Sequence, residues 1–150
     1  MKNCKVVIFK INNEEYAADI MQVERILEYI EPTKVPDSHK CIKGIIDYQD
    51  IVLPVVDVKK RFHLSLTEYG EDSKIIVLKG KEAYAGICVD MVVEVLDIES
   101  EKLEEAPLIT KREANKYIKS VLKKDNRIIV LLDTDILLNI DNIGSYNNNL

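Results

Sequence analysis

Hydrophobic residues along this chain come mostly in short runs of four to eight residues that are rich in Val and Ile and are separated by polar turns. Runs of this length and composition are typical of β-strands. Asn, Asp and Gly residues stand between most of the runs, as turn chemistry requires. The pattern predicts a mostly β protein with strands at Lys5–Ile11, Glu15–Ile20, Ile42–Tyr48, Ile51–Asp57, Lys74–Leu78, Tyr84–Asp90, Ile118–Lys123 and Ile128–Leu132.

Two short segments interrupt the strand pattern directly after an aspartate. They are Asp57–Phe62 and Asp133–Leu138. An aspartate at the first position can accept a hydrogen bond from the backbone of a following helical turn. We therefore expect two short helices, each with its aspartate as N-cap.

Each expected helix stands at the end of a longer segment, and these two segments resemble each other in sequence. Ile42–Ile46 aligns with Ile118–Leu122, and the same alignment without gaps places Val55–Asp57 against Leu131–Asp133. Both pairs of strands should therefore form antiparallel hairpins of one design. A second resemblance lies upstream, between Ile20–Leu27 and Val89–Leu96. The number of residues that separates these two segments differs by seven from the number that separates the two hairpins. We interpret the chain as internally duplicated.

One half of such a duplication holds about five short strands, and curling into a small barrel would remove exposed sheet edges. We therefore expect residues 1–140 to form one domain of two small, intertwined barrels that share a core. The halves should meet in the polar stretch Thr67–Asp72, so that the second unit begins near residue 73. Residues 141–150 contain four Asn without apolar periodicity, which predicts a flexible polar tail.

The composition of the chain argues against several classes of function. The net charge of −5, with basic residues scattered among acidic ones, argues against a nucleic-acid partner, because phosphate binding relies on clustered Lys and Arg. Three widely spaced cysteines fit a reducing compartment, so we expect a cytoplasmic protein. No apolar run approaches the roughly 20 residues that span a bilayer, which argues against direct membrane insertion.

Candidate catalytic and ligand-holding groups are few. His39 and His63 have no second His or Cys at metal-ligand spacing, and Cys88 stands between aliphatic residues as a small core residue would. Asp57 and Asp133 end strands at corresponding repeat positions, where capping explains them. There is no glycine-rich phosphate loop. The sequence therefore predicts a protein that is not an enzyme, with no metal site and no cofactor.

One segment carries a family resemblance. Ile42–Phe62 closely resembles the signature hairpin of CheW-like domains, and Gly44, Pro54, Asp57 and Phe62 match that pattern. Two further motifs of the family are matched by Val23 with Ile26, in its Val-x-Glu-Ile segment, and by Tyr84–Asp90, in its Gly-aliphatic-x-Val-Asp motif. The resemblance covers residues 4 to 139.

This resemblance implies two five-stranded SH3-like barrels around a shared core, with short helices. It also implies a non-enzymatic adaptor that couples chemoreceptor signalling tips to a chemotaxis histidine kinase. The partners would be the cytoplasmic tip of the receptor and the regulatory domain of the kinase. The partner-binding positions implied for this chain are Val23, Arg25, Ile26, Gly44 and Gln49. Some of these positions have an alternative, structural explanation. Val23 and Ile26 would belong to the core side of a strand, and Gly44 would permit a bend or a close backbone approach in a strand.

The chain also departs from the family pattern. Asp47–Asp50 replaces Asn-Leu-Arg-Gly, and Arg25 replaces the Glu of Val-x-Glu-Ile. Because both possible members of one ion pair have changed, we predict that Arg25 and Gln49 are neighbours. Two other functions stay open: a divergent scaffold that binds kinase or itself without standard receptor docking, and a small-ligand-binding β-barrel protein or enzyme.

Overall fold

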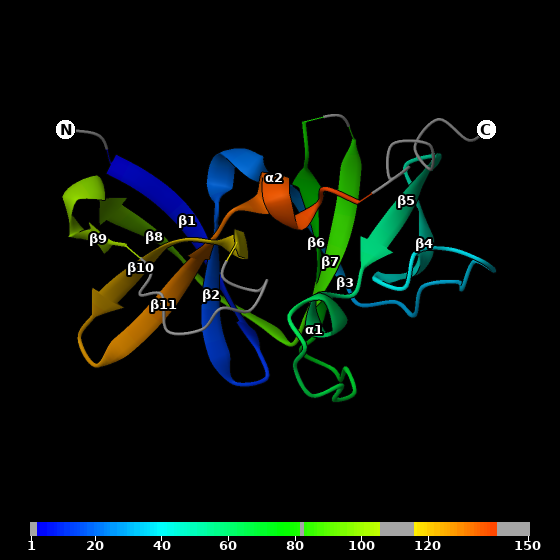
Figure 1. Cartoon of the computed structure of the whole chain (residues 1–150), viewed down its shortest axis with the longest axis horizontal. Coiled ribbons are helices and arrows are strands. Elements are labelled where there is room, and N and C mark those ends of the chain that lie inside the picture. Colours follow the sequence, from blue (N-terminus) through cyan, green and yellow to red (C-terminus); the bar gives the residue numbers. More distant parts are fainter. Residues whose placement is uncertain (1–2, 82, 106–115, 141–150) are drawn as a thin grey trace.

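The computed structural model describes residues 3–81, 83–105 and 116–140. It contains two β-sheets side by side, with the six-stranded sheet on the left and the five-stranded sheet on the right of Figure 1. The elements in chain order are β1 (Asn3–Ile11), β2 (Glu14–Asp19), η1 (Ile20–Gln22), β3 (Val23–Glu28), β4 (Ile42–Tyr48), β5 (Ile51–Val56), α1 (Val58–Arg61), β6 (Lys74–Lys79), β7 (Tyr84–Val89), β8 (Met91–Glu99), η2 (Ser100–Lys102), β9 (Leu103–Glu104), β10 (Ile118–Lys124), β11 (Arg127–Leu132) and α2 (Thr134–Leu137).

The predicted fold class is confirmed, and each predicted strand and helix is present. Strands β3, β8 and β9 were not predicted. The segment 99–105, with its four glutamates, forms η2 and the two-residue strand β9. The sixth strand of the larger sheet is therefore a short addition to a five-stranded plan. The predicted tail, 141–150, lies outside the described residues.

The two sheets have the same strand order. The smaller sheet reads β3-β6-β7-β5-β4, and the larger reads β8-β1-β2-β11-β10-β9. In the sequence duplication, β1 to β5 correspond to β6, β7, β8, β10 and β11. Each sheet thus combines the first hairpin of one repeat with the three later strands of the other repeat. Strands of different repeats pair with each other at four places. Two of these pairs are antiparallel, β3–β6 and β8–β1, and two are parallel, β5–β7 and β11–β2.

This exchange distributes the strands of both sequence repeats between the two sheets. A unit that begins near residue 73 would contain β6 and β7 but not β3, β4 and β5, whereas the smaller sheet contains all five strands. Residue 73 is a boundary between sequence repeats and not between sheets. The repeats are continuous in sequence, but the strands that pair with one another come from both.

The two predicted antiparallel hairpins are confirmed, and they are equivalent in detail. Strand β4 pairs with β5, and β10 pairs with β11, with a register shift at Ile42/Gly44 in one and at Ile118/Ser120 in the other. The β4–β5 turn has positive φ angles at Gln49 (49°) and Asp50 (67°), which Asn, Asp and Gly adopt most readily.

Both predicted aspartate caps are confirmed. The Asp57 side chain accepts a hydrogen bond from the backbone N–H of Lys60, and Asp133 accepts one from Ile136, both at 3.1 Å. The backbone N–H of each cap donates at 2.7 Å to a carbonyl just before the preceding hairpin, that of Cys41 or Tyr117. The duplicated aspartates therefore end their strands and begin their helices in the same way.

The core explains why several strands are uninterrupted apolar runs. In β6, Ile75 and Val77 face a cluster inside the smaller sheet, while Ile76 and Leu78 face a central cluster. That central cluster also receives Phe9 from β1, so it is shared by both sheets. A strand buried on both faces needs apolar residues at every position and not at alternate ones. The expected common core is therefore present.

Candidate partner-binding surface

The five residues implied in partner binding lie in three places. Val23, Arg25 and Ile26 belong to β3, Gly44 belongs to β4, and Gln49 lies in the β4–β5 turn. Strand β3 forms one edge of the smaller sheet and β4 forms the other. The fold therefore groups the three β3 residues and separates them along the sheet from the other two.

Strand β3 presents both core and surface positions. Val23 is half-buried and packs against the central cluster, whereas Ile26 is 39% exposed. Arg25 is exposed, and a register shift between Val23 and Arg25 leaves Glu24 as the additional residue opposite β6. A bulge of this kind bends an edge strand and redirects its side chains. The role as strand core therefore applies to Val23, while Ile26 is available on the surface.

The edge strand β8 carries the surface residues that the sequence analysis did not identify. Met91, Val93 and Val95 alternate along β8 and are 41%, 37% and 52% exposed. Alternate residues of a strand lie on one face. The signal that could have found them was present, because the parallel between Ile20–Leu27 and Val89–Leu96 places Val95 at the position of Ile26.

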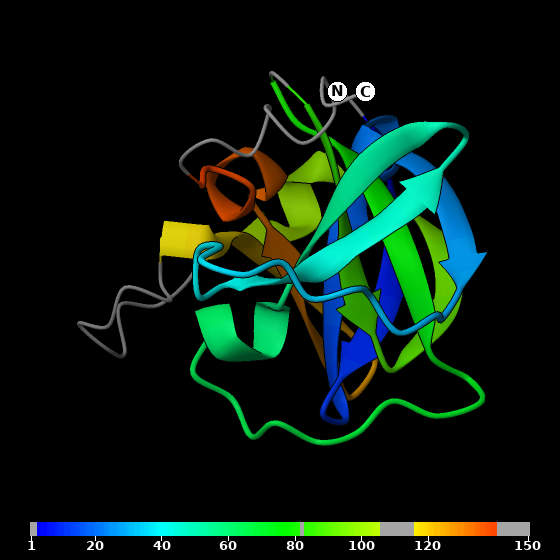
Figure 2. The ribbon, with the colours of Figure 1, turned by 90° about the vertical axis from the view of Figure 1, so that its right-hand side faces the viewer.

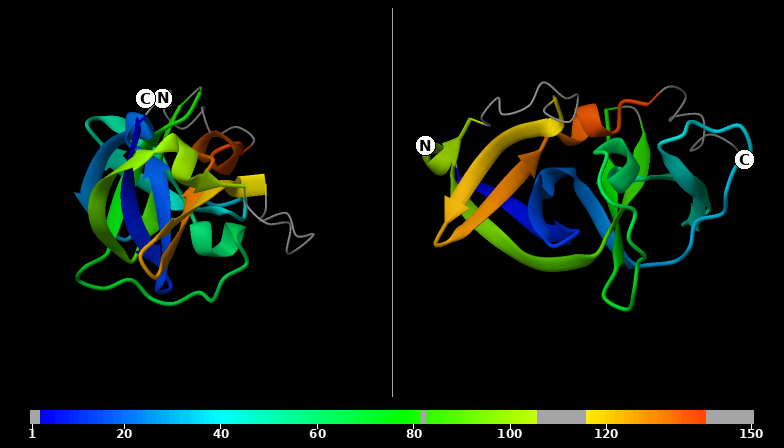
Figure 3. Two further views of the ribbon diagram at one scale, coloured as in Figure 1. Left: turned by 90° about the vertical axis from the view of Figure 1, so that its left-hand side faces the viewer. Right: turned by 60° about the horizontal axis from the view of Figure 1, so that its bottom comes forward.

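The two edge strands meet at the centre of the molecule. Val92, the counterpart of Val23 in β8, packs against the same central cluster as Val23. From there β3 and β8 run outward in opposite directions, as the right-hand view of Figure 3 shows. Exposed apolar residues accompany both strands. We call this set the β3–β8 surface, and it consists of Met21, Ile26, Met91, Val93 and Val95.

Gly44 is buried and has a packing role. A Cβ at this position would collide with the carbonyl oxygen of Thr33 and lie 2.8 Å from the Cβ of Pro32. The backbone of Thr33 exchanges two hydrogen bonds with Ile45, at 2.8 and 2.9 Å. Gly44 therefore permits the connector between β3 and β4 to lie directly on strand β4.

Arg25 and Gln49 are both exposed, and no hydrogen bond joins their side chains. Glu24, the neighbour of Arg25, lies 4.0 Å from the Lys79 ammonium across the β3–β6 pair. That Arg25 and Gln49 are neighbours stays a prediction.

A buried ion pair holds α1 against the first hairpin. Lys59 is 1% exposed, and its ammonium donates to Asp90 at 2.9 Å and to the Thr67 hydroxyl at 2.8 Å. The other Asp90 oxygen accepts from the backbone N–H of Asn12 in the β1–β2 turn, at 2.7 Å. The Lys59 ammonium also lies 4.1 Å from the centre of the Tyr69 ring. Asp90 thus serves the contact between the two sheets, unlike the capping aspartates.

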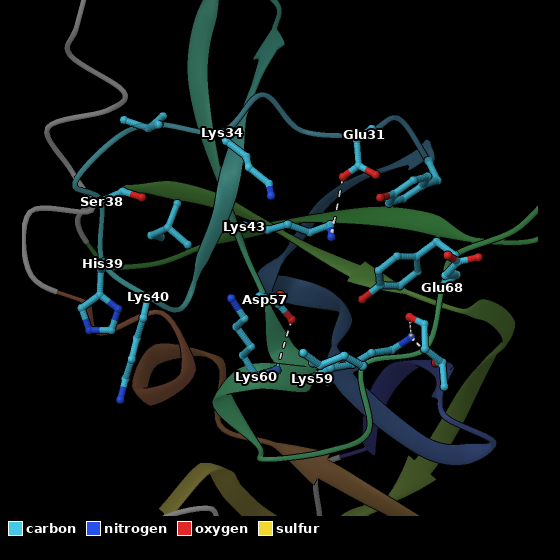
Figure 4. Close-up of a pocket in the computed structure, with 16 residues that line it drawn as sticks. Glu31, Lys34, Ser38, His39, Lys40, Lys43, Asp57, Lys59, Lys60 and Glu68 are labelled. Carbon is cyan, nitrogen blue, oxygen red and sulfur yellow. Dashed lines mark hydrogen bonds and ion pairs between the residues drawn. The ribbon is translucent and has the colours of Figure 1, made fainter.

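Beside this ion pair lies a cavity of about 590 Å³. Its walls are the connector between β3 and β4, the start of α1 and the loop that follows α1, and Figure 2 shows the connector crossing above α1. Figure 4 shows the ammonium groups of Lys34, Lys43 and Lys60 pointing into this space from three different segments. We call it the basic recess.

Burial raises the pKa of several groups near the basic recess. It raises the pKa of the Tyr29 and Tyr69 hydroxyls well above their usual range, and their rings stack at 4.9 Å. Burial also raises the pKa of the Cys88 thiol to about 12, so the reactive thiolate is scarce at neutral pH. Among residues 3–81, 83–105 and 116–140 no group of three or more His, Cys, Asp or Glu side chains could hold a metal ion.

Comparison with known proteins places this geometry in a family. The family model described as CheW-like domain matches residues 5–142. The chain belongs to the CheW-like domain family. Among CheW proteins, the chemotaxis protein CheW of Thermotoga maritima is 31% identical over 138 residues, which cover 92% of this chain and 89% of the relative. CheW of Bacillus subtilis is 29% identical over 134 residues, or 89% of this chain and 86% of the relative.

A solved CheW structure has the same fold. The crystal structure of the scaffolding protein TtCheW from Thermoanaerobacter tengcongensis superposes with a TM-score of 0.85 at 29% identity, covering 96% of this chain and 92% of that one. In the part of our chain that the structure describes, no helix has the length and apolar character needed to cross a membrane. The CheW-like fold, the exposed β3–β8 surface and the connector on β4 are thus features of one domain.

Proposed function

We propose that this protein is a cytoplasmic, non-enzymatic adaptor of a chemotaxis system. It couples the cytoplasmic signalling tips of chemoreceptors to the regulatory domain of a chemotaxis histidine kinase. The relatives named chemotaxis protein CheW and the scaffolding protein TtCheW support this role. The observation that carries it is the β3–β8 surface, because exposed apolar residues gathered along two edge strands of a folded domain are typical of an interaction site.

The β3–β8 surface suits the receptor tip as its partner. Its apolar side chains come from two edge strands that diverge from one point, so they offer an extended contact and not a closed pocket. Glu24 and Arg25 are exposed beside Ile26, where charged residues contribute to orientation more than to affinity. A partner with an apolar stripe would bury Ile26 on β3 and Val95 on β8.

A second candidate function is a scaffold that binds the kinase or a second copy of itself without standard receptor docking. It is favoured by the β4–β5 turn, where Asp47–Asp50 replaces the family's Asn-Leu-Arg-Gly. Asp47, Gln49 and Asp50 are all exposed, so the changed side chains face any partner that approaches this turn. Under this hypothesis the kinase contact persists and the receptor contact is lost.

Sedimentation binding of each partner pair tests the proposal. The full chain is mixed separately with a receptor-tip fragment and with the kinase regulatory domain. Ile26→Asp and Val95→Asp should each weaken receptor binding at least about tenfold, because a carboxylate would be buried in an apolar contact. The matched control is Ile136→Asp on α2, since Ile136 is 37% exposed and lies outside the β3–β8 surface.

Two results would contradict the proposal. If the unmodified chain binds the kinase domain but not the receptor tip, the second candidate function is correct. If it binds neither, or if Ile136→Asp weakens receptor binding as much as Ile26→Asp does, the β3–β8 surface is not the docking site.

A further inference from the structure

The basic recess collects positive charge in an acidic protein. Five lysines and three acidic residues line it, although the chain as a whole has a net charge of −5. Lysines on a solvated surface normally spread apart, because like charges repel and water hydrates each ammonium. Here Lys34, Lys43 and Lys60 converge from three segments on one space (Figure 4).

These three ammonium groups are only weakly neutralised by the protein. Within the described residues, Lys34 and Lys60 form no ion pair through their side chains. Lys43 lies 3.6 Å from Glu31, whose side chain is 71% exposed and therefore well hydrated. Pairs of this kind contribute little attraction. The recess thus retains positive charge that a multivalent anion could neutralise.

The acidic groups in the walls are mostly committed elsewhere. Asp57 caps α1 through the Lys60 backbone N–H, and its side chain is buried at the floor of the recess. Lys59 is paired with Asp90, outside the lining, so this buried ammonium is already compensated. What remains for a ligand is the three converging lysines together with the hydroxyl of Ser38.

One wall of the recess is aromatic. Tyr29 and Tyr69 stack there, and the Lys43 ammonium lies 5.4 Å from the centre of the Tyr69 ring. The Tyr69 hydroxyl is buried and has no hydrogen-bond partner within the described part of the chain. Because its pKa is raised, this hydroxyl stays protonated and keeps its capacity to donate. A ring or other apolar group of a ligand could rest beside this wall while its charged group meets the lysines.

We propose that the basic recess is a binding site for a small organic phosphate ester. Its phosphate dianion is held by Lys34, Lys43 and Lys60, and its apolar part contacts the Tyr29–Tyr69 wall. A dianion fits better than a single carboxylate, because more than one unpaired ammonium points at the same space and lysine binds phosphate as a point charge. The cavity of about 590 Å³ has room for a small molecule of this class.

Nuclear magnetic resonance titration of the full chain with phenyl phosphate tests this site. Phenyl phosphate should produce saturable shifts that concentrate in residues 29–43 and 57–69, with a Kd below about 1 mM. Inorganic phosphate lacks the ring and benzoate lacks the second charge, so each should bind at least about threefold more weakly. Lys43→Ala and Lys60→Ala should each weaken phenyl phosphate binding about fivefold to tenfold.

Lys124→Ala is the matched control, because Lys124 is exposed on β10 and far from the recess lining. A thermal melt of each variant shows whether it is folded, and Lys60→Gln replaces any variant that is not. The site is refuted by shifts that do not saturate by about 10 mM, or by an equal loss of affinity in Lys124→Ala. Benzoate binding as tightly as phenyl phosphate would refute the assignment to a phosphate ester.

Discussion

The two sheets share one strand order, and in each a connector pairs with the strand that follows it, but the residue before the paired position differs. On β4, the connector backbone lies so close that only a glycine fits beneath Thr33. At the equivalent place on β10, Ser120 replaces Gly44, and the connector forms the short strand β9, in which Glu104 pairs with Val121. The comparison shows that a glycine in a duplicated hairpin can be specified by its neighbour and not by the strand itself.

The two short helices also occupy equivalent places but differ in one residue and its contacts. Their capping aspartates are equivalent, but the second helical position holds Lys59 in α1 and Asp135 in α2. Lys59 is buried and paired with Asp90, whereas Asp135 is partly exposed. Only α1 is therefore tied by an ion pair to the turn of the opposite sheet.

Breaking this ion pair should have the largest effect on stability. Lys59→Ala leaves Asp90 without its ammonium partner and should lower the free energy of unfolding by about 3 kcal/mol. The equivalent change in α2, Asp135→Ala, should cost less than about 0.5 kcal/mol. Urea denaturation of both variants measures the difference. Equal losses would show that the buried ion pair adds nothing beyond an ordinary helical position.

Filling the contact beneath Thr33 should have the next largest effect. Gly44→Ala forces the connector away from β4 and should cost about 2 kcal/mol. The reverse change in the other hairpin, Ser120→Gly, should cost about 0.5 to 1 kcal/mol, because glycine weakens a strand interior. Both values come from chemical denaturation. If Gly44→Ala is as mild as Ser120→Gly, the connector yields easily and the two hairpins are alike.

The Arg127–Glu15 ion pair gives the larger sheet a pH-dependent contribution. Arg127 donates to Glu15 at 2.6 Å and 3.1 Å, which lowers the pKa of the Glu15 carboxyl. The equivalent positions in the smaller sheet are Ile51 and Tyr84. A carboxyl whose pKa is lowered on folding stabilises the protein above its unfolded pKa of about 4.3, and this contribution is lost as the pH falls through the folded pKa.

Glu15→Gln should therefore cost about 1 kcal/mol at pH 7 and almost nothing near pH 3. Denaturation curves of the variant and the unmodified chain at the two pH values give the difference. Glu14→Gln is the control, since Glu14 is exposed and adjacent in the same strand. A loss that is independent of pH would assign the effect to packing.

The smallest effect is expected for Arg25 and Gln49. Arg25 is the counterpart of Glu94, whose carboxylate lies 2.9 Å from Arg127, and Arg127 is the counterpart of Ile51. This equivalence would bring Arg25 toward the β4–β5 turn. Gln49→Arg should then cost about 0.5 to 1 kcal/mol, and Arg25→Glu should recover it. A double-mutant cycle measures the coupling, and strictly additive effects would mean that the two side chains do not interact.

Local structure could be predicted well wherever burial determines it. Strand β6 had to be apolar throughout because both of its faces are covered, and Asp57 and Asp133 had to accept backbone hydrogen bonds. The edge strands β3 and β8 were missed, because an edge strand tolerates polar and apolar residues on its exposed face and so lacks a clear alternation. The burial of Lys59 was equally hidden, since lysine is seldom buried without a partner.

Which strands the intertwined repeats exchange could not be predicted from the sequence, for a different reason. In an unexchanged unit β3 would pair with β1, whereas it pairs with β6, the equivalent of β1. Both arrangements use the same contacts, so the residues of the pair carry no preference between them. The choice depends on the connectors between repeats. The partner-binding positions were affected too, because the sequence parallel places Val95 at the position of Ile26 but does not show that β8 is an edge strand.

The exchange of strands between the repeats also determines the order in which the protein can fold during synthesis. The smaller sheet is complete once β7 has left the ribosome. The hairpin β1–β2 emerges first of all, yet it must wait for β8, β10 and β11 before its own sheet can close. Pairing between segments so distant in the chain is slow. The oldest part of the nascent chain is therefore the last to be covered, and it is the part most in need of protection by chaperones.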